Sequence, residues 1–328
     1  MPGRLLLVVV SPRTPPGLLS WPAWQALRSG PVVTAADGPQ LPFLRDAGVQ
    51  VTVVDGLSAD ELQDRVAADR TLVWLTTGDA DAELVRTACN RMVAAGVQVE
   101  QLHGSYDPPG ARLLDVVAVL DRLRSPGGCP WDAAQTHASL MPYLLEEAYE
   151  AYQALEDGDP VGLREELGDV LLQVAFHARL AQEGEQPWSI DDVAGDLVDK
   201  LVRRHPHVFA GGSADDLEGS WEALKAAEKG RTSVTDGVPL AQPALSLAAK
   251  LQRRATRLGA PVPAVDGFGG ELWALVQRCR EAGVDPEAEL RQVARAYRDR
   301  LAAAEAAALA DGRDPSSLSS AEWEQSWS

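Results

Sequence analysis

The sequence predicts a mainly α-helical protein, a helical bundle preceded by a small N-terminal α/β domain. Short runs of aliphatic and β-branched residues alternate with helix-like stretches over residues 1–104, which is typical of a small parallel α/β domain. From residue 111 the pattern becomes wholly helical. Closely spaced turn residues at 104–110 mark the boundary between these two parts.

Five short strands are expected in the α/β domain, at residues 5–10, 32–34, 51–54, 72–75 and 97–100. The first run is too short to span a membrane and lacks the cleavage site of a secretory signal, so we expect a strand there. The loop that follows it, residues 11–17, lacks the repeated glycines that a phosphate-binding loop requires. No nucleotide or cofactor role is therefore predicted for this loop.

A helical hairpin is predicted in the middle of the chain. Residues 113–123 form one amphipathic stretch, which residues 125–132 interrupt before the hairpin begins. Gly158 suits the left-handed position after a helix, Asp159 is a good N-cap, and Pro160 fits the first position of the next helix. A further helix is expected to begin near Ser189, where the sequence resembles a capping box, and to end just before His205-Pro206.

Two carboxylate pairs lie symmetrically about the hairpin turn. Glu150 and Glu166 are each eight residues from Gly158, and Glu147 and Asp169 are each eleven residues from it. Since equal counts place residues at equal heights in an antiparallel pair, both pairs should lie roughly 12 to 17 Å from the turn. The i, i+3 spacing puts each pair on one helix face. The four acids can therefore meet across one interface.

Four converging carboxylates repel one another unless a cation lies between them. Oxygen ligands favour Mg²⁺ or Mn²⁺, and Mg²⁺ commonly binds substrate phosphates as well. The alternative is that these acids merely solvate an outer helix face, which is the more frequent situation for a single pair. The apolar run over residues 167–180 argues against this alternative, because it places Asp169 in a segment expected to be largely buried.

Composition restricts the partners of the protein. The 328 residues include 30 Lys and Arg against 48 Asp and Glu, a formal charge of −18, so binding to nucleic acid or to an anionic membrane is not expected. The three cysteines, Cys89, Cys129 and Cys279, fit neither a disulfide framework nor a zinc site and indicate reduced thiols in the cytoplasm. A polyanionic substrate would need local cations. The basic residues at the end of the helix before His205 could supply them, or could simply complement the helix dipole.

Several motifs in order along the chain resemble the MazG family of nucleoside triphosphate pyrophosphohydrolases. They are Gly128-Cys-Pro-Trp-Asp132, Gln135-Thr136-His137, Leu145-Glu-Glu-Ala-Tyr-Glu150, Glu165-Glu-Leu-Gly-Asp169 and Arg203-Arg-His-Pro-His-Val-Phe209. The family signature, Glu-Glu-x-x-Glu followed by Glu-x-x-Asp, is met by Glu146, Glu147, Glu150, Glu166 and Asp169. The resemblance implies an all-α fold, a homodimer with a four-helix core, and Mg²⁺-dependent hydrolysis of nucleoside triphosphates to monophosphates and pyrophosphate.

The resemblance also implies roles for individual residues. Metal binding falls to Glu147, Glu150, Glu166 and Asp169. Glu146, rotated about 100° around the helix, is a candidate for positioning the attacking water or supporting the ligands. Contacts to the substrate phosphates fall to Lys200, Arg204 and Lys225. Trp131 and Trp221 are candidates to flank the base, although a tryptophan in a helical core is the more frequent situation.

The flanking regions match the family less well, so we predict three domains, 1–104, 111–232 and 238–328. The last resembles the entry to a second MazG copy over residues 242–254, but Gly267 and Gly270 occupy the positions where the family has acids, so this copy is expected to be degenerate. A metal-free packing or dimer role follows from this. The first domain resembles a truncated remnant of a tetrapyrrole methylase and lacks the glycine-rich loop of that family, so methylase activity is not predicted.

Taken together, the sequence predicts a dimeric cytoplasmic enzyme that removes non-standard triphosphates from the nucleotide pool. Two alternatives remain at this point. The acids could bind metal and nucleotide without efficient chemistry, in a sensor or scaffold module. The hairpin could also be a purely structural, solvated bundle, in which case divalent cations would not change its melting temperature.

Overall fold

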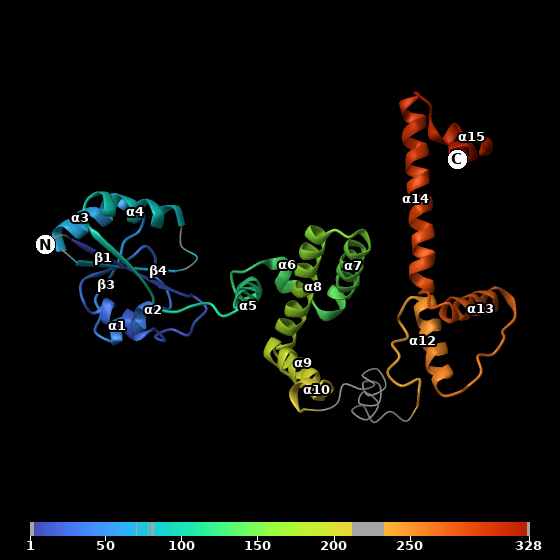
Figure 1. The fold of residues 1–328 in the computed structure, drawn as a ribbon, viewed down its shortest axis with the longest axis horizontal. Coiled ribbons are helices and arrows are strands. Elements are labelled where there is room, and N and C mark those ends of the chain that lie inside the picture. Colours follow the sequence, from blue (N-terminus) through green and yellow to red (C-terminus); the bar gives the residue numbers. More distant parts are fainter. Residues whose placement is uncertain (1–2, 70, 78, 80–81, 212–232, 327–328) are drawn as a thin grey trace. The chain divides into compact units, whose positions relative to one another are not determined.

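The protein is described from a computed structural model, which covers residues 3–69, 71–77, 79, 82–211 and 233–326. The chain divides into two compact units, Met1–Lys200 and Leu201–Ser328. The fold is mainly helical, with one small parallel sheet near the N-terminus (Figure 1). The predicted mainly helical character and the small N-terminal sheet are thereby confirmed, whereas the predicted division into three domains stays a prediction.

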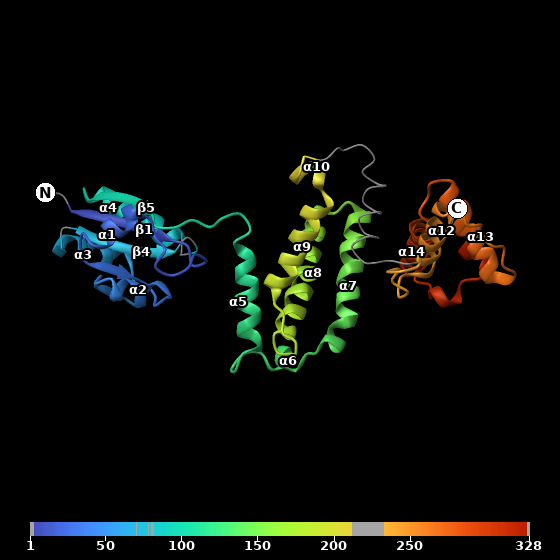
Figure 2. The same cartoon turned by 90° about the horizontal axis from the view of Figure 1, so that it is seen from below.

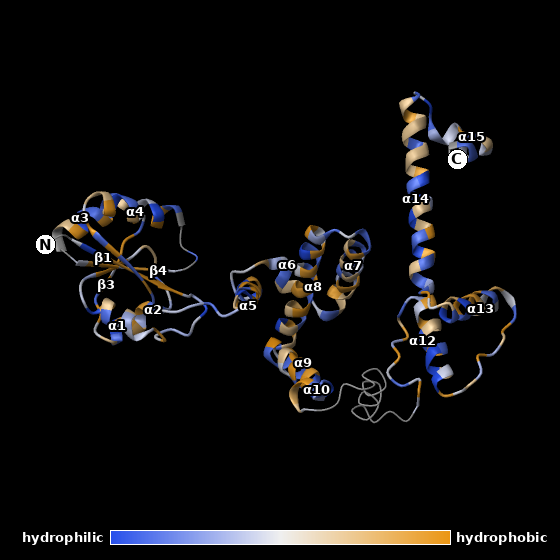
Figure 3. Ribbon diagram, in the orientation of Figure 1, coloured by the Kyte–Doolittle hydropathy of each residue, from blue (hydrophilic) through white to orange (hydrophobic). Residues whose placement is uncertain are grey.

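The five predicted strands are all present. They are β1 (Arg4–Val10), β2 (Val32–Thr34), β3 (Val51–Val53), β4 (Thr71–Thr77) and β5 (Gln98–His103). The sheet has the order β3-β2-β4-β1-β5, and every pair is parallel. The central strands are hydrophobic along most of their length, as Figure 3 shows, because both faces of a parallel sheet are covered by helices.

Helices cover both faces of this sheet. On one face, α1 (Trp21–Leu27) and α2 (Gln40–Asp46) pack against side chains such as Leu6, Val8 and Leu75. On the other face, α3 (Ala59–Asp69) and α4 (Ala82–Ala94) pack against Leu7 and Trp74 (Figure 1). Successive residues of β1 and β4 alternate between the two cores because side chains alternate along a strand. The result is a doubly wound sheet.

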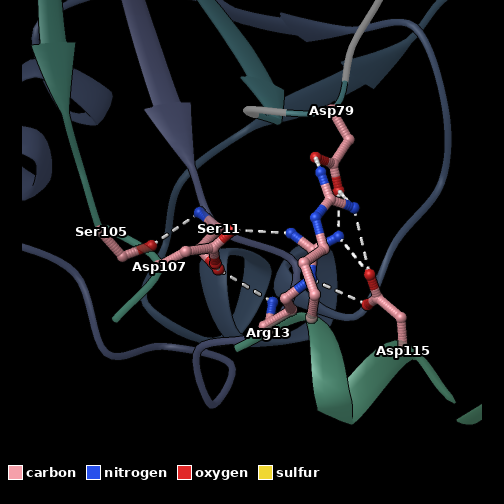
Figure 4. Close-up of polar contacts among 7 residues, drawn as sticks. Ser11, Arg13, Asp79, Ser105, Asp107 and Asp115 are labelled. Atoms are coloured by element: carbon pink, nitrogen blue, oxygen red, sulfur yellow. Dashed lines mark hydrogen bonds and ion pairs between the residues drawn. The ribbon is translucent and has the colours of Figure 1, made fainter. Parts of the chain in front are cut away.

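A buried arginine fixes the loop that follows β1. The Arg13 side chain is 5% exposed, and its guanidinium binds the carboxylates of Asp79 at 2.5 Å, Asp107 at 2.7 Å and Asp115 at 2.6 Å (Figure 4). These hydrogen bonds raise the pKa of Arg13, and those donated by Arg13 contribute most to the lowered pKa of Asp115. Asp115 belongs to α5 (Arg112–Arg124), so Arg13 ties the loop directly to the first helix after the linker.

The helical hairpin forms as predicted from α7 (His137–Asp157) and α8 (Pro160–Ala181). Gly158 closes α7 in the left-handed conformation with φ of 64°, which a residue with a Cβ adopts at a cost. The Asp159 carboxylate accepts hydrogen bonds from the backbone N–H groups of Val161 and Gly162 and so caps α8. The turn chemistry of these residues therefore sets where both helices end.

The hairpin packs on α5 at the end far from its turn. Leu120 of α5, Leu140 of α7, and Phe176 and Leu180 of α8 form one buried cluster. Helix α8 lies between α5 and α7 (Figure 2). The short helix α6 (Pro130–Ala134) precedes α7. Since this core is confined to one end, the middle of the hairpin has no apolar cover from α5.

Helix α9 (Ile190–Arg204) follows the hairpin and is succeeded by α10 (Pro206–Phe209). One half of the expected capping box is present, because the backbone N–H of Ser189 donates to Asp192 at 2.7 Å. The Ser189 hydroxyl caps the helix through the N–H of Asp191, at 3.1 Å, instead of through that of Asp192. Lys200, Arg203 and Arg204 end α9 just before Pro206, as predicted.

The second unit is helical throughout the part that the structure describes. It contains α12 (Ala244–Arg257), α13 (Gly267–Glu281), α14 (Pro286–Ala310), a 3₁₀ turn at Pro315–Ser317 and α15 (Ser320–Ser326). Gly270 packs so closely on the preceding loop that an added Cβ would overlap the carbonyl of Val265. Among the residues described, none of the helices combines the length and the apolar character needed to cross a bilayer.

Candidate active site

The predicted carboxylates of the hairpin come together in space. One carboxylate oxygen each from Glu147, Glu150 and Glu166 lies within 4.8 Å of the other two. Two of these residues are on α7 and one is on α8, at the level that the equal residue counts from Gly158 predict. Asp169 is outside this set of three, although its charge acts on Glu147 and Glu166. Over the described residues, no other set of three potential metal ligands meets this distance criterion.

The acids perturb one another electrostatically. Desolvation is the largest cause of the raised pKa of Glu147, followed by repulsion from Asp169 and Glu150. Desolvation is also the main cause of the raised pKa of Glu166, and the charges of Glu150 and Asp169 add to it. Glu146 is exposed and makes the smallest contribution to the Glu147 shift. The site therefore resists full ionisation when no cation is bound.

The surroundings of the acids are more open than the sequence suggested. Residues 167–180 were expected to form a largely buried segment, but Leu167 is 52% exposed and Leu172 is 36% exposed. Burial begins only near Gln173, where α8 meets the cluster around Phe176. The expectation is wrong for the first half of the segment, because the apolar cluster of α5, α7 and α8 reaches only the second half of α8.

Two of the predicted phosphate-binding residues lie on α9. Lys200 and Arg204 are four residues apart near its C-terminal end, which places them on one face of the helix. Both are half-buried. Lys225 and Trp221, the other two predicted substrate contacts in this part of the chain, fall outside the residues that the structure describes.

Trp131 does not belong to a helical core. It lies in α6, is 54% exposed, and meets the ring of Tyr143 edge-on at 6.4 Å between centroids. The alternative of a core tryptophan is therefore wrong. The short helix leaves the indole at the surface because Pro130 and Gln135 confine α6 to little more than one turn.

Arg124 of α5, which the sequence analysis did not single out, binds groups at the end of the hairpin that packs on α5. Its side chain is 5% exposed and forms a bidentate pair with Glu183 at 3.1 and 2.8 Å. It also donates to the backbone carbonyl of Asp132 and stacks over the ring of Phe176. This arginine lowers the pKa of Glu183. Arg124 was missed in the sequence because a basic residue near the end of an amphipathic helix is common, and nothing in the neighbouring residues indicates that it pairs with Glu183.

Comparison with known proteins identifies the domain class. Residues 135–209, which contain the two acidic motifs, match the sequence profile of the MazG nucleotide pyrophosphohydrolase domain. The helical hairpin and its acids are thus the central part of a nucleotide pyrophosphohydrolase domain.

The relatives extend this result beyond the matched domain. The nucleoside triphosphate pyrophosphohydrolase/pyrophosphatase MazG of Thermotoga maritima is 39% identical over 57% of this chain and 83% of its own length. The nucleoside triphosphate pyrophosphohydrolase of Mycobacterium tuberculosis is 47% identical over 60% of this chain and 59% of its own. An uncharacterized 26.1 kDa protein of Streptomyces cacaoi is 55% identical over 63% of this chain and 88% of its own length. The chain belongs to the MazG family of nucleoside triphosphate pyrophosphohydrolases.

Proposed function

We propose that the chain hydrolyses nucleoside triphosphates to nucleoside monophosphates and pyrophosphate at the acid set of the hairpin, with Mg²⁺ as its metal. Membership of the MazG family supports the reaction class. The observation that carries the proposal is the meeting of Glu147, Glu150 and Glu166 within 4.8 Å from two helices. Such a cluster is costly without a cation and well suited to one.

The residues present fit a hard divalent cation. The set offers carboxylate oxygens, which are the ligands that Mg²⁺ and Mn²⁺ prefer, and a positive charge there would relieve the repulsion that contributes to the raised pKa values of Glu147 and Glu166. We assign Glu147, Glu150, Glu166 and Asp169 as the ligands. When bound, the metal would supply positive charge that offsets the negative charge of the phosphate oxygens, and it would lower the pKa of a water molecule bound to it.

The other residues divide the remaining work. Release of pyrophosphate requires water to attack the α-phosphorus, so a carboxylate must hold that water in line and accept its proton. We assign this role to Glu146, which is exposed beside Glu147. Lys200 and Arg204 on α9 would contact the phosphate oxygens, and Trp131, exposed on α6, would stack on the base. Lys225 and Trp221 stay candidates for the same two roles.

The products distinguish this reaction from other hydrolyses. The chain is incubated with Mg²⁺ and a nucleoside triphosphate in ¹⁸O-labelled water, and the products are separated by ion exchange. We expect monophosphate and pyrophosphate, with the label in the monophosphate, because water attacks the α-phosphorus. Release of nucleoside diphosphate and free phosphate would contradict the assignment. So would ¹⁸O label in the pyrophosphate.

The metal should stabilise the fold more at neutral than at acidic pH. Glu147 and Glu166 have raised pKa values when folded, so between the ordinary glutamate pKa of 4.5 and the raised values the folded chain holds more protons than the unfolded chain. The stability of the metal-free chain therefore falls as the pH rises through that window. Mg²⁺ binds more tightly over the same window, because fewer protons compete with it for the carboxylates. At a metal concentration of about 100 times the Kd, the gain is about 2.7 kcal/mol.

Thermal unfolding measures this effect. Melting temperatures are compared with EDTA and with Mg²⁺ from about pH 4.5 to about pH 8. We expect the Mg²⁺-induced increase to shrink as the pH falls. An increase that is independent of pH would show that the cation binds groups other than these glutamates.

We also propose that the chain is a homodimer whose subunits pack through their hairpins. Apolar and aromatic side chains are exposed along both helices, which is typical of an interface rather than of a free surface. On α7 they include Leu145, Tyr149 and Leu155, and on α8 Val161 and Leu167. A mass of one chain in light scattering would contradict this arrangement.

The physiological substrates are proposed to be non-standard nucleoside triphosphates, which the enzyme would remove from the cytoplasmic nucleotide pool. The three unpaired cysteines are compatible with a reducing compartment. The Mycobacterium tuberculosis and Thermotoga maritima relatives carry nucleoside triphosphates in their names but no particular base. A panel of ordinary and oxidised triphosphates would contradict the proposal if ordinary triphosphates had equal kcat/KM values.

A further inference from the structure

A cavity of about 300 Å³ opens at the carboxyl edge of the sheet in the first unit. All of its lining residues come from positions 10–84, so it shares none with the acid set of the hairpin. Val10 ends β1, Thr34 ends β2, and Thr76 lies near the end of β4. Three neighbouring strands therefore end at this cavity.

The topology of the sheet explains why the cavity lies there. β1 and β4 pair side by side, but β1 leads into α1 on one face and β4 leads into α4 on the other (Figure 1). Where adjacent strands send the chain to opposite faces, their carboxyl ends leave a crevice, and ligands of doubly wound proteins bind in such crevices. The cavity therefore has the position of a ligand site, not of a packing defect.

The lining restricts the chemistry of the ligand. Apolar side chains line most of the cavity, including Val10, Leu41, Leu75 and Leu84. The lining contains no lysine, arginine or histidine, and its one charged residue is Asp37, which is exposed. A phosphate group would find no cation here and would meet a carboxylate. The volume is at the lower end for small-molecule sites, so an uncharged molecule of modest size fits.

Two lining residues carry side-chain donors that have no partner. Gln40 and Trp74 are 5% and 1% exposed, and the Nε2 atom of Gln40 and the Nε1 atom of Trp74 make no hydrogen bond. The other end of the Gln40 amide is fixed, because its Oε1 atom accepts from the backbone N–H of Gly17 at 2.8 Å. Buried donors are almost always paired. Both residues line the cavity while their nitrogens are buried, so an acceptor in the cavity pairs with them only after the side chains turn toward it.

We propose that this cavity binds an uncharged heterocycle with carbonyl acceptors, of the class of a nucleobase or an unphosphorylated nucleoside. The apolar walls take the body of the molecule, and the donors of Gln40 and Trp74 bind its carbonyl oxygens. This site is separate from the hydrolysis of triphosphates, since none of its residues belongs to the acid set.

Calorimetric titration of the full chain with inosine and with uridine tests the proposal. EDTA is present, and the chain carries Glu150→Gln, so that the acid set takes no part. We expect saturable binding of at least one probe. Trp74→Phe removes one donor and should weaken binding about 3- to 10-fold, as expected for one hydrogen bond. Gln40→Glu replaces the other donor with a carboxylate, which repels a carbonyl oxygen, and should weaken binding more than Trp74→Phe does. Trp24→Phe, the same change outside the cavity, should leave the affinity within about twofold.

A second variant blocks the cavity by changing an exposed residue, so the proposal stays testable even if the donor variants misfold. Ala36 lines the cavity and is exposed, so Ala36→Trp fills the mouth without disturbing the core, and Ala94→Trp on the exposed surface of α4 is its control. We expect Ala36→Trp to abolish binding and Ala94→Trp to retain it, both with normal circular dichroism. The proposal is overturned if neither probe binds, or if Ala36→Trp binds as well as its control.

Discussion

Glu150→Gln is expected to abolish pyrophosphate release while leaving the fold intact. The substitution keeps the shape of the side chain but removes one charge from the set in which Glu147, Glu150 and Glu166 meet within 4.8 Å. Glu150 also repels both neighbours whose pKa values are raised, so it is central to the electrostatics of the site. Losing one ligand should lower kcat by at least about a thousandfold, or about 4 kcal/mol in the barrier.

Two readouts separate a chemical effect from misfolding. The variant should keep its circular dichroism spectrum and lose most of the Mg²⁺-induced increase in melting temperature. Without metal it should be at least as stable as the unaltered chain, because one source of repulsion is gone. Glu185→Gln, in the exposed loop after α8, is the matched control and should change neither readout. Turnover of the Glu150 variant at the normal rate would remove this residue from the mechanism.

Arg124→Met should destabilise the helical hairpin clearly more than a surface substitution does. The buried guanidinium holds Glu183, the carbonyl of Asp132 and the ring of Phe176, and methionine can replace only the apolar part of these contacts. Breaking a fully buried pair costs about 3–5 kcal/mol. Since the Glu183 side chain is 43% exposed, we expect a smaller cost of about 2–4 kcal/mol.

Hydrogen exchange measures this loss locally, which matters in a chain of two compact units. Amides of α5 and α8 should exchange faster in the variant, whereas those of β1 and β4 should not change. Arg122→Met is the matched control: Arg122 is exposed and, among the described residues, donates to the carbonyl of Pro126 alone, at 3.4 Å. Equal exchange in the two variants would mean that Arg124 does not hold the hairpin.

Local chemistry explains the parts of the fold that could be predicted. The turn at Gly158, Asp159 and Pro160 follows from the backbone preferences of these residues, and the five strands follow from short β-rich runs. The heights of the four acids follow from counting along two helices joined by that turn. In each case neighbouring residues contain the required information.

The rest depends on contacts between distant residues. The order of the strands and the bonds of Arg13 join segments that lie up to about a hundred residues apart, and no local pattern specifies them. The pairing of Arg124 with Glu183 spans 59 residues. Burial was predicted incorrectly around Leu167. An apolar side chain favours burial, but the sequence does not show which segment or which molecule would bury it.

The close packing of Gly270 has a consequence for how the second unit can change over evolution. A single codon change to aspartate or glutamate at this position would drive its Cβ into the carbonyl of Val265. The main chain would first have to take another path around that loop. Point mutation alone therefore offers no short route by which an acid could be placed at this position.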